Sequence, residues 1–172
     1  MNEYKVNKVL GVILGTALFL QVLHIVDGAF HPKEANASSE GAAKAEQSAG
    51  GSQALNTLLA GASAEHGAQV AKQCQICHNL QEGQGNKIGP DLYGVVDRPV
   101  ASVAGFNYTP ALKAKGGKWT FAALDKWISD PRADVPGTAM TFAGISNEKQ
   151  RADLIAYLDT LSKSPAPLPK AK

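Results

Sequence analysis

Residues 74–80 read CQICHNL, and Cys74 and Cys77 are the only cysteines in the 172-residue chain. A pair of cysteines two residues apart, with a histidine directly behind, is compatible with four structures: a disulfide, half of a zinc site, a thioredoxin-type redox pair, or a site of covalent haem attachment. Each alternative makes a different demand on the rest of the chain, so the remaining sequence decides among them.

Three of the alternatives fit the remaining sequence poorly. A disulfide between Cys74 and Cys77 would close a very short loop and would constrain little of the unfolded chain. A structural zinc ion needs four protein ligands, usually from two such pairs, and beyond Cys74 and Cys77 the chain offers only a few scattered histidines. A thioredoxin-type pair follows a strand, and no strand pattern precedes Cys74. The pattern therefore favours one haem bound through both sulfurs, with His78 as a ligand of its iron.

Haem iron in an electron carrier needs a second strong axial ligand, so that no position is open to oxygen or substrate. The chain has only two methionines, Met1 and Met140. Met1 lies before a predicted membrane segment, whereas Met140 ends a Pro-Gly loop, PGTAM, at residues 136–140. Most methionines fill cores, but this is the only thioether available on the side of the histidine. We therefore expect Met140 to be the second iron ligand.

The first thirty residues form a separate segment. Two lysines precede VLGVILGTALFLQVLHIV, residues 9–26, which as a helix would be about 27 Å long and close to the thickness of a bilayer core. This predicts a single transmembrane signal-anchor helix over 9–30, with residues 1–8 in the cytoplasm and the rest of the chain exported. A cleaved signal peptide is the alternative, because Ala35-Asn36-Ala37 resembles a cleavage site.

The composition of the exported part predicts three further segments. Residues 31–62 are rich in Ala, Ser, Gly, Glu and Gln, which favours a flexible low-complexity linker, although the leucines at 55, 58 and 59 could form a helical turn resting on the domain that follows. Residues 63–163 carry the folded domain, and residues 164–172 form a C-terminal tail containing Pro and Lys.

Helix signals dominate residues 63–163, and no alternating strand pattern competes with them. Helices are expected to begin after four capping residues: Ser63, Thr109, Thr120 and Asn147. The third of these helices should end at Asp130-Pro131. Long loops, 79–108 and 130–146, separate the helices, which is unusual in a compact domain unless a bound group fills its centre. The domain is therefore predicted to be all-α.

Residues 65–161 resemble class I cytochromes c of the mitochondrial and alphaproteobacterial type. Five separated blocks carry the resemblance: CQICH at 74–78, IGPDLYGVVDRPV at 88–100, GFNYTPALKAKGGKW at 105–119, DPRADVPGTAM at 130–140 and FAGISNEKQRADLIAYL at 142–158. The anchor and linker are similar to those of membrane-tethered alphaproteobacterial cytochromes c. The resemblance implies the class I cytochrome c fold around one covalently bound haem c.

The resemblance also implies roles for residues around the haem. The Pro90 carbonyl would accept a hydrogen bond from the His78 ring. Three residues match positions that hydrogen-bond a buried haem propionate: Arg98, Tyr108 and Trp119. Thr138 matches a residue near the ligating Met and the other propionate, and Gly67 a residue that lets the first helix approach the last. Two positions depart from the family pattern, with Trp127 in place of a usual Tyr and Leu112 in place of a usual Asn.

By the same resemblance, the protein would be an electron carrier and not an enzyme. It would move single electrons in the periplasm, at the bacterial inner membrane, from a quinol–cytochrome c reductase to a terminal oxidase. A net charge of +2 and few aromatic residues argue against nucleic-acid binding, and a carrier needs no small-molecule substrate. The alternatives are a haem peroxidase or nitrite reductase module, which would need an open iron site, and a fixed cytochrome c subunit of an oxidase complex.

Overall fold

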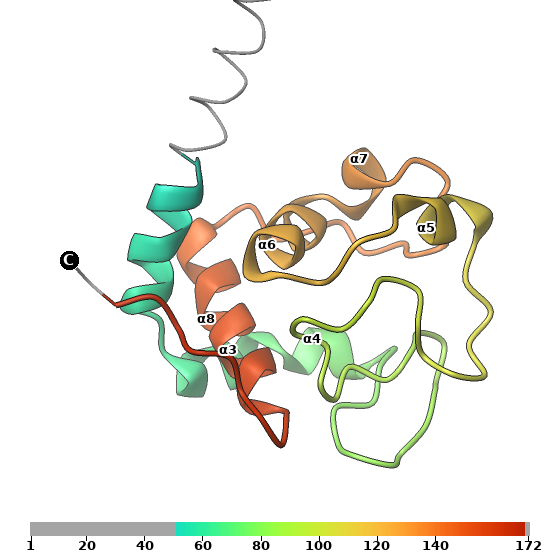
Figure 1. Cartoon of the computed structure of the whole chain (residues 1–172), viewed down its shortest axis with the longest axis horizontal. Coiled ribbons are helices and arrows are strands. Elements are labelled where there is room, and N and C mark those ends of the chain that lie inside the picture. Colours follow the sequence, from blue (N-terminus) through green and yellow to red (C-terminus); the bar gives the residue numbers. More distant parts are fainter. Residues whose placement is uncertain (1–50, 171–172) are drawn as a thin grey trace, which may run out of the picture. The chain divides into compact units, whose positions relative to one another are not determined.

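The computed structural model describes residues 51–170, so the predicted segments 1–8 and 9–30 lie outside the described residues. The labelled helices of Figure 1 are α3 (Ala64–Val70), α4 (Lys72–Gln75), α5 (Pro110–Lys115), α6 (Phe121–Ser129), α7 (Pro131–Asp134) and α8 (Glu148–Thr160), and residues 51–60 are also helical. Within 51–170 there is no strand, only an isolated antiparallel bridge between Pro99 and Lys118. The all-α prediction is confirmed for this part of the chain. None of its helices is long and apolar enough to cross a membrane.

Each of the four predicted caps opens a helix. The side-chain oxygen of each cap accepts a hydrogen bond from the backbone N–H three residues later, which satisfies one of the free donors of the first turn. The capping residues are Ser63 of α3, Thr109 of α5, Thr120 of α6 and Asn147 of α8. The helix that begins after Ser63 ends at Val70, and a second short helix, α4, follows Ala71 and contains Cys74.

The Asp130-Pro131 pair ends one helix and begins another. As predicted, α6 stops at Ser129, because Asp130 adopts an extended backbone. The same Asp130 side chain then accepts hydrogen bonds from the backbone N–H groups of Arg132 and Ala133, and Pro131 occupies the first position of α7. The segment expected to be a continuous loop therefore contains a short helix, which leads directly to Met140.

Helices α3 and α8, which are far apart in the sequence, cross in close contact. At the crossing a Cβ atom on Gly67 would lie 1.9 Å from the Asp153 carbonyl oxygen, so only glycine permits this approach. The role implied for Gly67 is thus consistent with the geometry. Helix α6 packs on α8 as well, and these contacts form the core of the domain.

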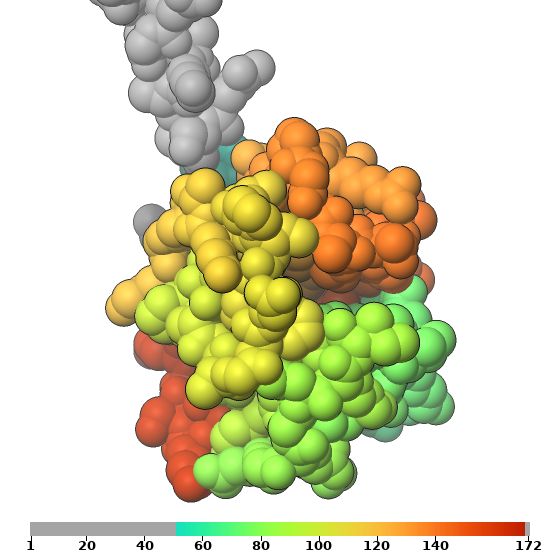
Figure 2. Space-filling view, turned by 90° about the vertical axis from the view of Figure 1, so that its right-hand side faces the viewer, coloured from blue at the N-terminus to red at the C-terminus, as the bar shows by residue number. Residues whose placement is uncertain are grey.

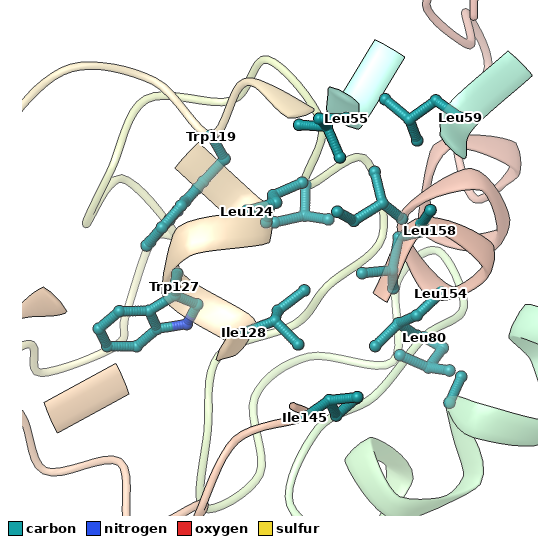
Figure 3. Packing of buried hydrophobic residues seen from close by; sticks show 14 of the residues in the cluster. Leu55, Leu59, Leu80, Trp119, Leu124, Trp127, Ile128, Ile145, Leu154 and Leu158 are labelled. Carbon is teal, nitrogen blue, oxygen red and sulfur yellow. The ribbon is translucent and has the colours of Figure 1, made fainter. Parts of the chain in front are cut away.

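Residues 51–60, which the sequence assigns to the linker, are helical and belong to the folded domain. Leu55 and Leu59, four residues apart and so on one face of this helix, are buried in the same cluster as Leu124, Leu154 and Leu158 (Figure 3). The linker expectation therefore does not hold for these residues. The alternative interpretation, a helical segment resting on the domain, describes them correctly.

Candidate functional site

The two cysteines lie at the end of the first helical region. Cys74 is in α4, and the backbone N–H groups of Cys77 and His78 both donate to its carbonyl oxygen, at 3.1 and 2.9 Å. Both thiols are free and partly buried, and burial raises the pKa of Cys74 to about 11. No group of three or more His, Cys, Asp or Glu side chains within residues 51–170 could hold a metal ion by itself. The structure thus supports neither a disulfide nor a zinc site here.

The ring of His78 is held in one orientation and one tautomer. Its Nδ1 lies 2.7 Å from the Pro90 carbonyl oxygen, and since a carbonyl only accepts, Nδ1 must be the donor. Burial lowers the pKa of His78, which keeps the imidazole neutral and leaves Nε2 with a free lone pair. A Cβ on Gly89 would lie 2.2 Å from the ring, so this glycine makes room for the imidazole. Nε2 is therefore prepared to bind a metal ion.

Arg98 is positioned by two backbone carbonyls. Its Nη1 donates to the Tyr93 carbonyl at 2.9 Å and its Nη2 to the Asp91 carbonyl at 2.8 Å. The Nε atom is buried and has no hydrogen-bond partner among the described residues. An unpaired buried donor on a positive group is costly, so a bound anionic acceptor would satisfy it. This is the feature of the site that most directly indicates a charged ligand group.

Tyr108 and Trp119, the two aromatic residues predicted to act with Arg98, are both buried. The Trp119 backbone N–H donates to the Arg98 carbonyl at 2.9 Å. The Tyr108 hydroxyl oxygen accepts from the Val103 N–H at 3.3 Å, which leaves its own O–H free to donate, and burial raises the pKa of Tyr108. The structure thus assembles this group from three loop positions that are far apart in the sequence.

Met140 lies at the end of a loop that its neighbours hold in place. Its backbone N–H donates to the Thr138 hydroxyl at 3.2 Å, and the Thr138 N–H donates to the Val135 carbonyl at 3.1 Å. The Met140 side chain is partly buried and packs against the same apolar cluster as Cys74. Figure 2 shows the face on which the segment carrying this loop, in orange, lies beside the green and yellow segments.

Two contacts near the site did not follow from sequence reasoning. The rings of Trp119 and Trp127 lie 5.4 Å apart at 49°, so the tryptophan that departs from the family pattern packs on a predicted site residue. Lys87 donates to the Gln75 carbonyl at 2.8 Å and ties the loop after the cysteines back to the CxxCH segment. The residues of each contact belong to different segments of the chain, eight and twelve positions apart, and no local sequence pattern predicts that they meet.

Comparisons with known proteins agree on one family. The family model described as "Cytochrome c" matches residues 64–162. A cytochrome c homolog of Bradyrhizobium diazoefficiens is 43% identical over 186 residues, with 99% of each chain covered. Cytochrome c2 of Rhodoplanes tepidamans is 49% identical over 92 residues, which cover 54% of this chain and 86% of that one. The structure of cytochrome cH from Methylobacterium extorquens superposes with a TM-score of 0.54 at 40% identity, covering 57% of this chain and 98% of the other.

These matches cover the region in which the structure places the CxxCH segment and the Met140 loop. The family binds one covalent haem c with an iron, and its members are electron carriers and not enzymes. The fold, helical and without strands in the described residues, is that of class I cytochromes c. The chain therefore belongs to the cytochrome c family.

Proposed function

We propose that Cys74 and Cys77 bind the haem through thioether bonds, and that His78 Nε2 and the Met140 sulfur are the axial ligands of its iron. The observation that carries this proposal is the 2.7 Å hydrogen bond from His78 Nδ1 to Pro90, which leaves Nε2 free beside two free thiols. Haem supplies an iron that alternates between the ferrous and ferric states. With both axial positions taken by the chain, no site remains open for a substrate.

The residues around the site also fit the charge of a haem. We assign Arg98, Tyr108 and Trp119 to one propionate, because Arg98 Nε has no hydrogen-bond partner among residues 51–170 and the Tyr108 O–H is free to donate. Both donors are in a buried region, where a carboxylate needs such partners to remain ionised. Thr138, whose hydroxyl accepts from the Met140 N–H, is assigned to the surroundings of the Met ligand and the second propionate.

For the whole protein we propose a membrane-tethered carrier in the periplasm. Residues 9–30 would anchor it in the inner membrane, and it would take electrons from a quinol–cytochrome c reductase and pass them to a terminal oxidase. The apolar run at 9–26 supports the anchor. The Bradyrhizobium relative, which aligns over 99% of this chain, supports treating the N-terminal segment as part of the same protein type.

Exposed apolar side chains at the CxxCH segment support docking by short-range contact. Ile76 and Ile88 have 74% and 80% of their surfaces exposed, and each lies two residues before one partner of the His78–Pro90 contact. Apolar side chains of this kind favour short-range contact with a partner, whereas long-range steering requires charge. A tether would offset weak steering, because it keeps the domain close to partners in the same membrane.

The folded domain reaches back at least to Leu55, so the proposed linker is 31–50 and not 31–62. A flexible chain of this length has a root-mean-square span of about 25 Å and a maximum of about 70 Å. Confinement within that distance of the membrane can raise the effective concentration to about the millimolar range. Weak docking is then sufficient, and release remains fast.

Two measurements test the tether. First, the intact protein should remain with membranes after a high-salt wash, with an N-terminus at or near Met1. A soluble protein beginning at Ser38 would show that the N-terminal segment is a cleaved signal. Second, a deletion of ten residues within 31–50 should slow electron transfer between membrane-bound reductase and oxidase. A same-length Gly/Ser replacement of 31–50 is the control, and it should keep the wild-type rate.

Equal rates of electron transfer in the deletion, the replacement and the intact protein would show that the length of the linker does not limit transfer.

Purification in mild detergent distinguishes a mobile carrier from a fixed oxidase subunit. A mobile carrier leaves its partners under these conditions, whereas a subunit stays bound in a fixed ratio to the oxidase.

A further inference from the structure

A buried carboxylate lies where three helices meet, next to the Met140 loop. The Asp134 side chain, at the end of α7, is only 1% exposed. Lys115 of α5 donates to its Oδ2 at 2.7 Å, and Lys126 Nζ of α6 lies 2.9 Å from its Oδ1. The Lys126 contact is an ion pair without the geometry of a hydrogen bond, and within residues 51–170 Oδ1 has no hydrogen-bond partner. One carboxylate thus connects α5, α6 and α7.

The arrangement continues from Asp134 to Met140 through the backbone. Val135, the next residue, is buried, and its carbonyl accepts from the Thr138 N–H at 3.1 Å. Thr138 in turn accepts from the Met140 N–H at 3.2 Å. A Cβ on Gly137 would lie 3.3 Å from the Ala111 Cβ, so the loop also touches α5 directly. Helix α5 therefore contacts Asp134, just before the Met140 loop (residues 135–140), and Gly137 within it.

We infer that Asp134 is a positioning residue for the axial ligand: its ion pairs with Lys115 and Lys126 hold the Met140 loop against α5 and α6. The other contacts of the loop, the hydrogen bonds within it, the buried Val135 and the approach of Gly137 to Ala111, include no ion pair to α5 or α6 among the described residues. The inference rests on the proposed role of Met140 as iron ligand. Asp134 lies six residues before Met140 in the chain. It would therefore stabilise the bond from Met140 to the iron without contacting the iron itself.

The ionisation of Asp134 agrees with this arrangement. Burial alone would disfavour the charged form, but the hydrogen bond and charges of Lys115 and Lys126 outweigh it and lower the pKa of Asp134. The carboxylate is therefore charged at neutral pH, and both ion pairs are present. Lys115 is the stronger partner, because its side chain is 20% exposed whereas that of Lys126 is 72% exposed and screened by water.

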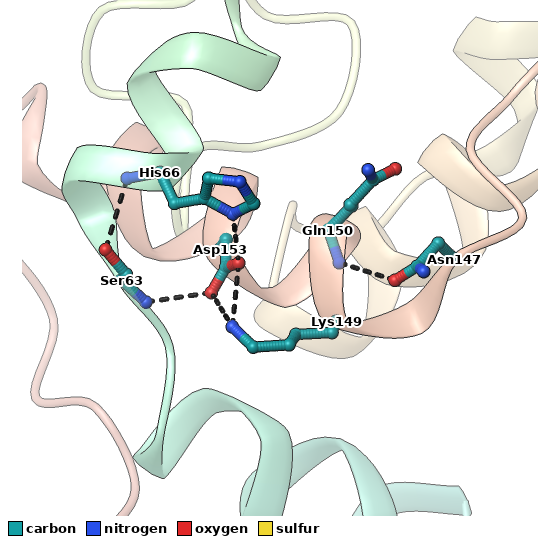
Figure 4. A network of polar contacts seen from close by, with 6 residues as sticks. All are labelled: Ser63, His66, Asn147, Lys149, Gln150 and Asp153. Carbon is teal, nitrogen blue, oxygen red and sulfur yellow. Dashed lines mark hydrogen bonds and ion pairs between the residues drawn. The ribbon is translucent and has the colours of Figure 1, made fainter.

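The matched control is a second buried carboxylate, Asp153 of α8, whose side chain is fully buried. It accepts from the Ser63 N–H at 2.8 Å, from His66 at 2.9 Å and from Lys149 at 3.0 Å (Figure 4). These bonds connect α3 and α8 and do not involve the Met140 loop. Removing its charge should weaken the whole fold without a selective effect on the ligand.

The test uses the full-length holoprotein and two signals followed through one denaturant titration. The weak sulfur-to-iron absorption of the oxidised protein reports Met140 ligation, and far-ultraviolet circular dichroism reports the helices. In Asp134→Asn the ligation signal should disappear at clearly lower denaturant than the helical signal. Before the helices unfold, the equilibrium constant for Met release should exceed the wild-type value by about tenfold or more. In Asp153→Asn both signals should shift together.

Lys115→Met should release the ligand as Asp134→Asn does, and Lys126→Met should do so less. These variants keep the proposal testable if Asp134→Asn does not fold. If the ligation signal and the helical signal of Asp134→Asn and Lys115→Met disappear at the same denaturant concentration, as expected for Asp153→Asn, the inference is overturned. Asp134 would then be a general stabilising residue. Absence of the absorption from the wild-type protein itself would instead overturn the proposed role of Met140.

Discussion

At the scale of single residues, two nitrogen atoms show how the site is prepared for its cofactor. His78 Nε2 carries a free lone pair, because Nδ1 is committed to the Pro90 carbonyl. Arg98 Nε is buried without a hydrogen-bond partner in the described part of the chain, although its two Nη atoms donate to backbone carbonyls. One atom is suited to bind a metal and the other to donate to an anion. A haem with an iron and two propionates meets both requirements.

Met140→Ala should open one axial position of the iron. The oxidised protein should lose the sulfur-to-iron absorption, the redox potential should fall because the thioether no longer favours the ferrous state, and the reduced protein should bind carbon monoxide. Absorption spectra and a redox titration measure these changes. Thr141→Ala, an exposed neighbour, is the control and should behave as the wild type. An unchanged spectrum and potential in Met140→Ala would mean that another group binds the iron.

Arg98→Lys and Arg98→Met separate the charge of Arg98 from its hydrogen bonds. Both variants lose the paired bonds to the Asp91 and Tyr93 carbonyls, so the free energy of unfolding should fall by about 1.5–3 kcal/mol. Only Arg98→Met removes a positive charge near the haem. Loss of this charge favours ferric iron, so the redox potential of Arg98→Met should lie below that of Arg98→Lys. Denaturant unfolding and redox titration measure the two effects. Identical potentials in both variants would place Arg98 away from the haem charge.

At the scale of elements, the helix at 51–60 enlarges the domain by burying two leucines. Its residues gain their stability from the cluster with α6 and α8 and not from their own composition, which includes exposed Gly51, Ser52 and Gln53. Short helices of this length are marginal in water when isolated. The helix therefore exists because α6 and α8 present an apolar surface to it.

Leu59→Ala should lower the free energy of unfolding by about 2–5 kcal/mol, since it leaves a cavity in the core. Asn56→Ala, at an exposed position of the same helix, is the control and should change it by less than about 0.5 kcal/mol. Denaturant unfolding of the full-length holoprotein measures both. Equal effects of the two substitutions would mean that the helix does not pack on the core in solution.

At the scale of the whole molecule, buried carboxylates govern the response to acid. Burial opposes the charge of Asp134 and Asp153, but hydrogen bonds and lysines outweigh it and lower the pKa of both. Burial, together with the charge of Asp97, raises the pKa of Asp159, although its Oδ1 accepts a hydrogen bond from Ala166. The first two carboxylates therefore stabilise the fold at neutral pH, and the third destabilises it.

The sign of each shift predicts the pH profile of stability. A lowered folded pKa gives stability that is present above the unfolded value of 3.8 and is lost as the pH falls through the folded value. Asp159 acts in the opposite sense, with a small gain as the pH falls through its raised pKa. The lowered pKa of the buried His78 opposes that gain, because stability is lost as the pH falls below the unfolded value of 6.5. The free energy of unfolding should therefore fall most steeply below about pH 4.

Denaturant titrations between pH 7 and pH 2 measure this profile. In Asp153→Asn the free energy of unfolding should fall less steeply with decreasing pH, because the substitution removes one of the two carboxylates with a lowered pKa. Asp159→Asn should raise the stability at pH 7, because an amide can still accept from the Ala166 N–H without a buried charge. If the free energy of unfolding of Asp153→Asn fell with pH as steeply as that of the wild type, Asp153 would have the same pKa in the folded and unfolded states.

The sequence by itself determined the parts of this protein that depend on local chemistry. Helix starts at Ser63, Thr109, Thr120 and Asn147 follow from side chains that bond the next turn, and the structure confirms them. The CxxCH segment is equally local, because its spacing places two thiols and an imidazole on adjacent turns. The all-α class and the cytochrome c family also followed from such blocks.

Only the tertiary structure decided which distant groups meet. It placed the leucines of 51–60 in the core, paired Trp119 with Trp127, and brought Lys115 and Lys126 to the carboxylate of Asp134. The physical reason is the same in each case. A leucine in a polar segment or an aspartate after Pro-Arg-Ala has no local partner that reveals its burial. Its surroundings are created by helices that the chain brings together only when it folds.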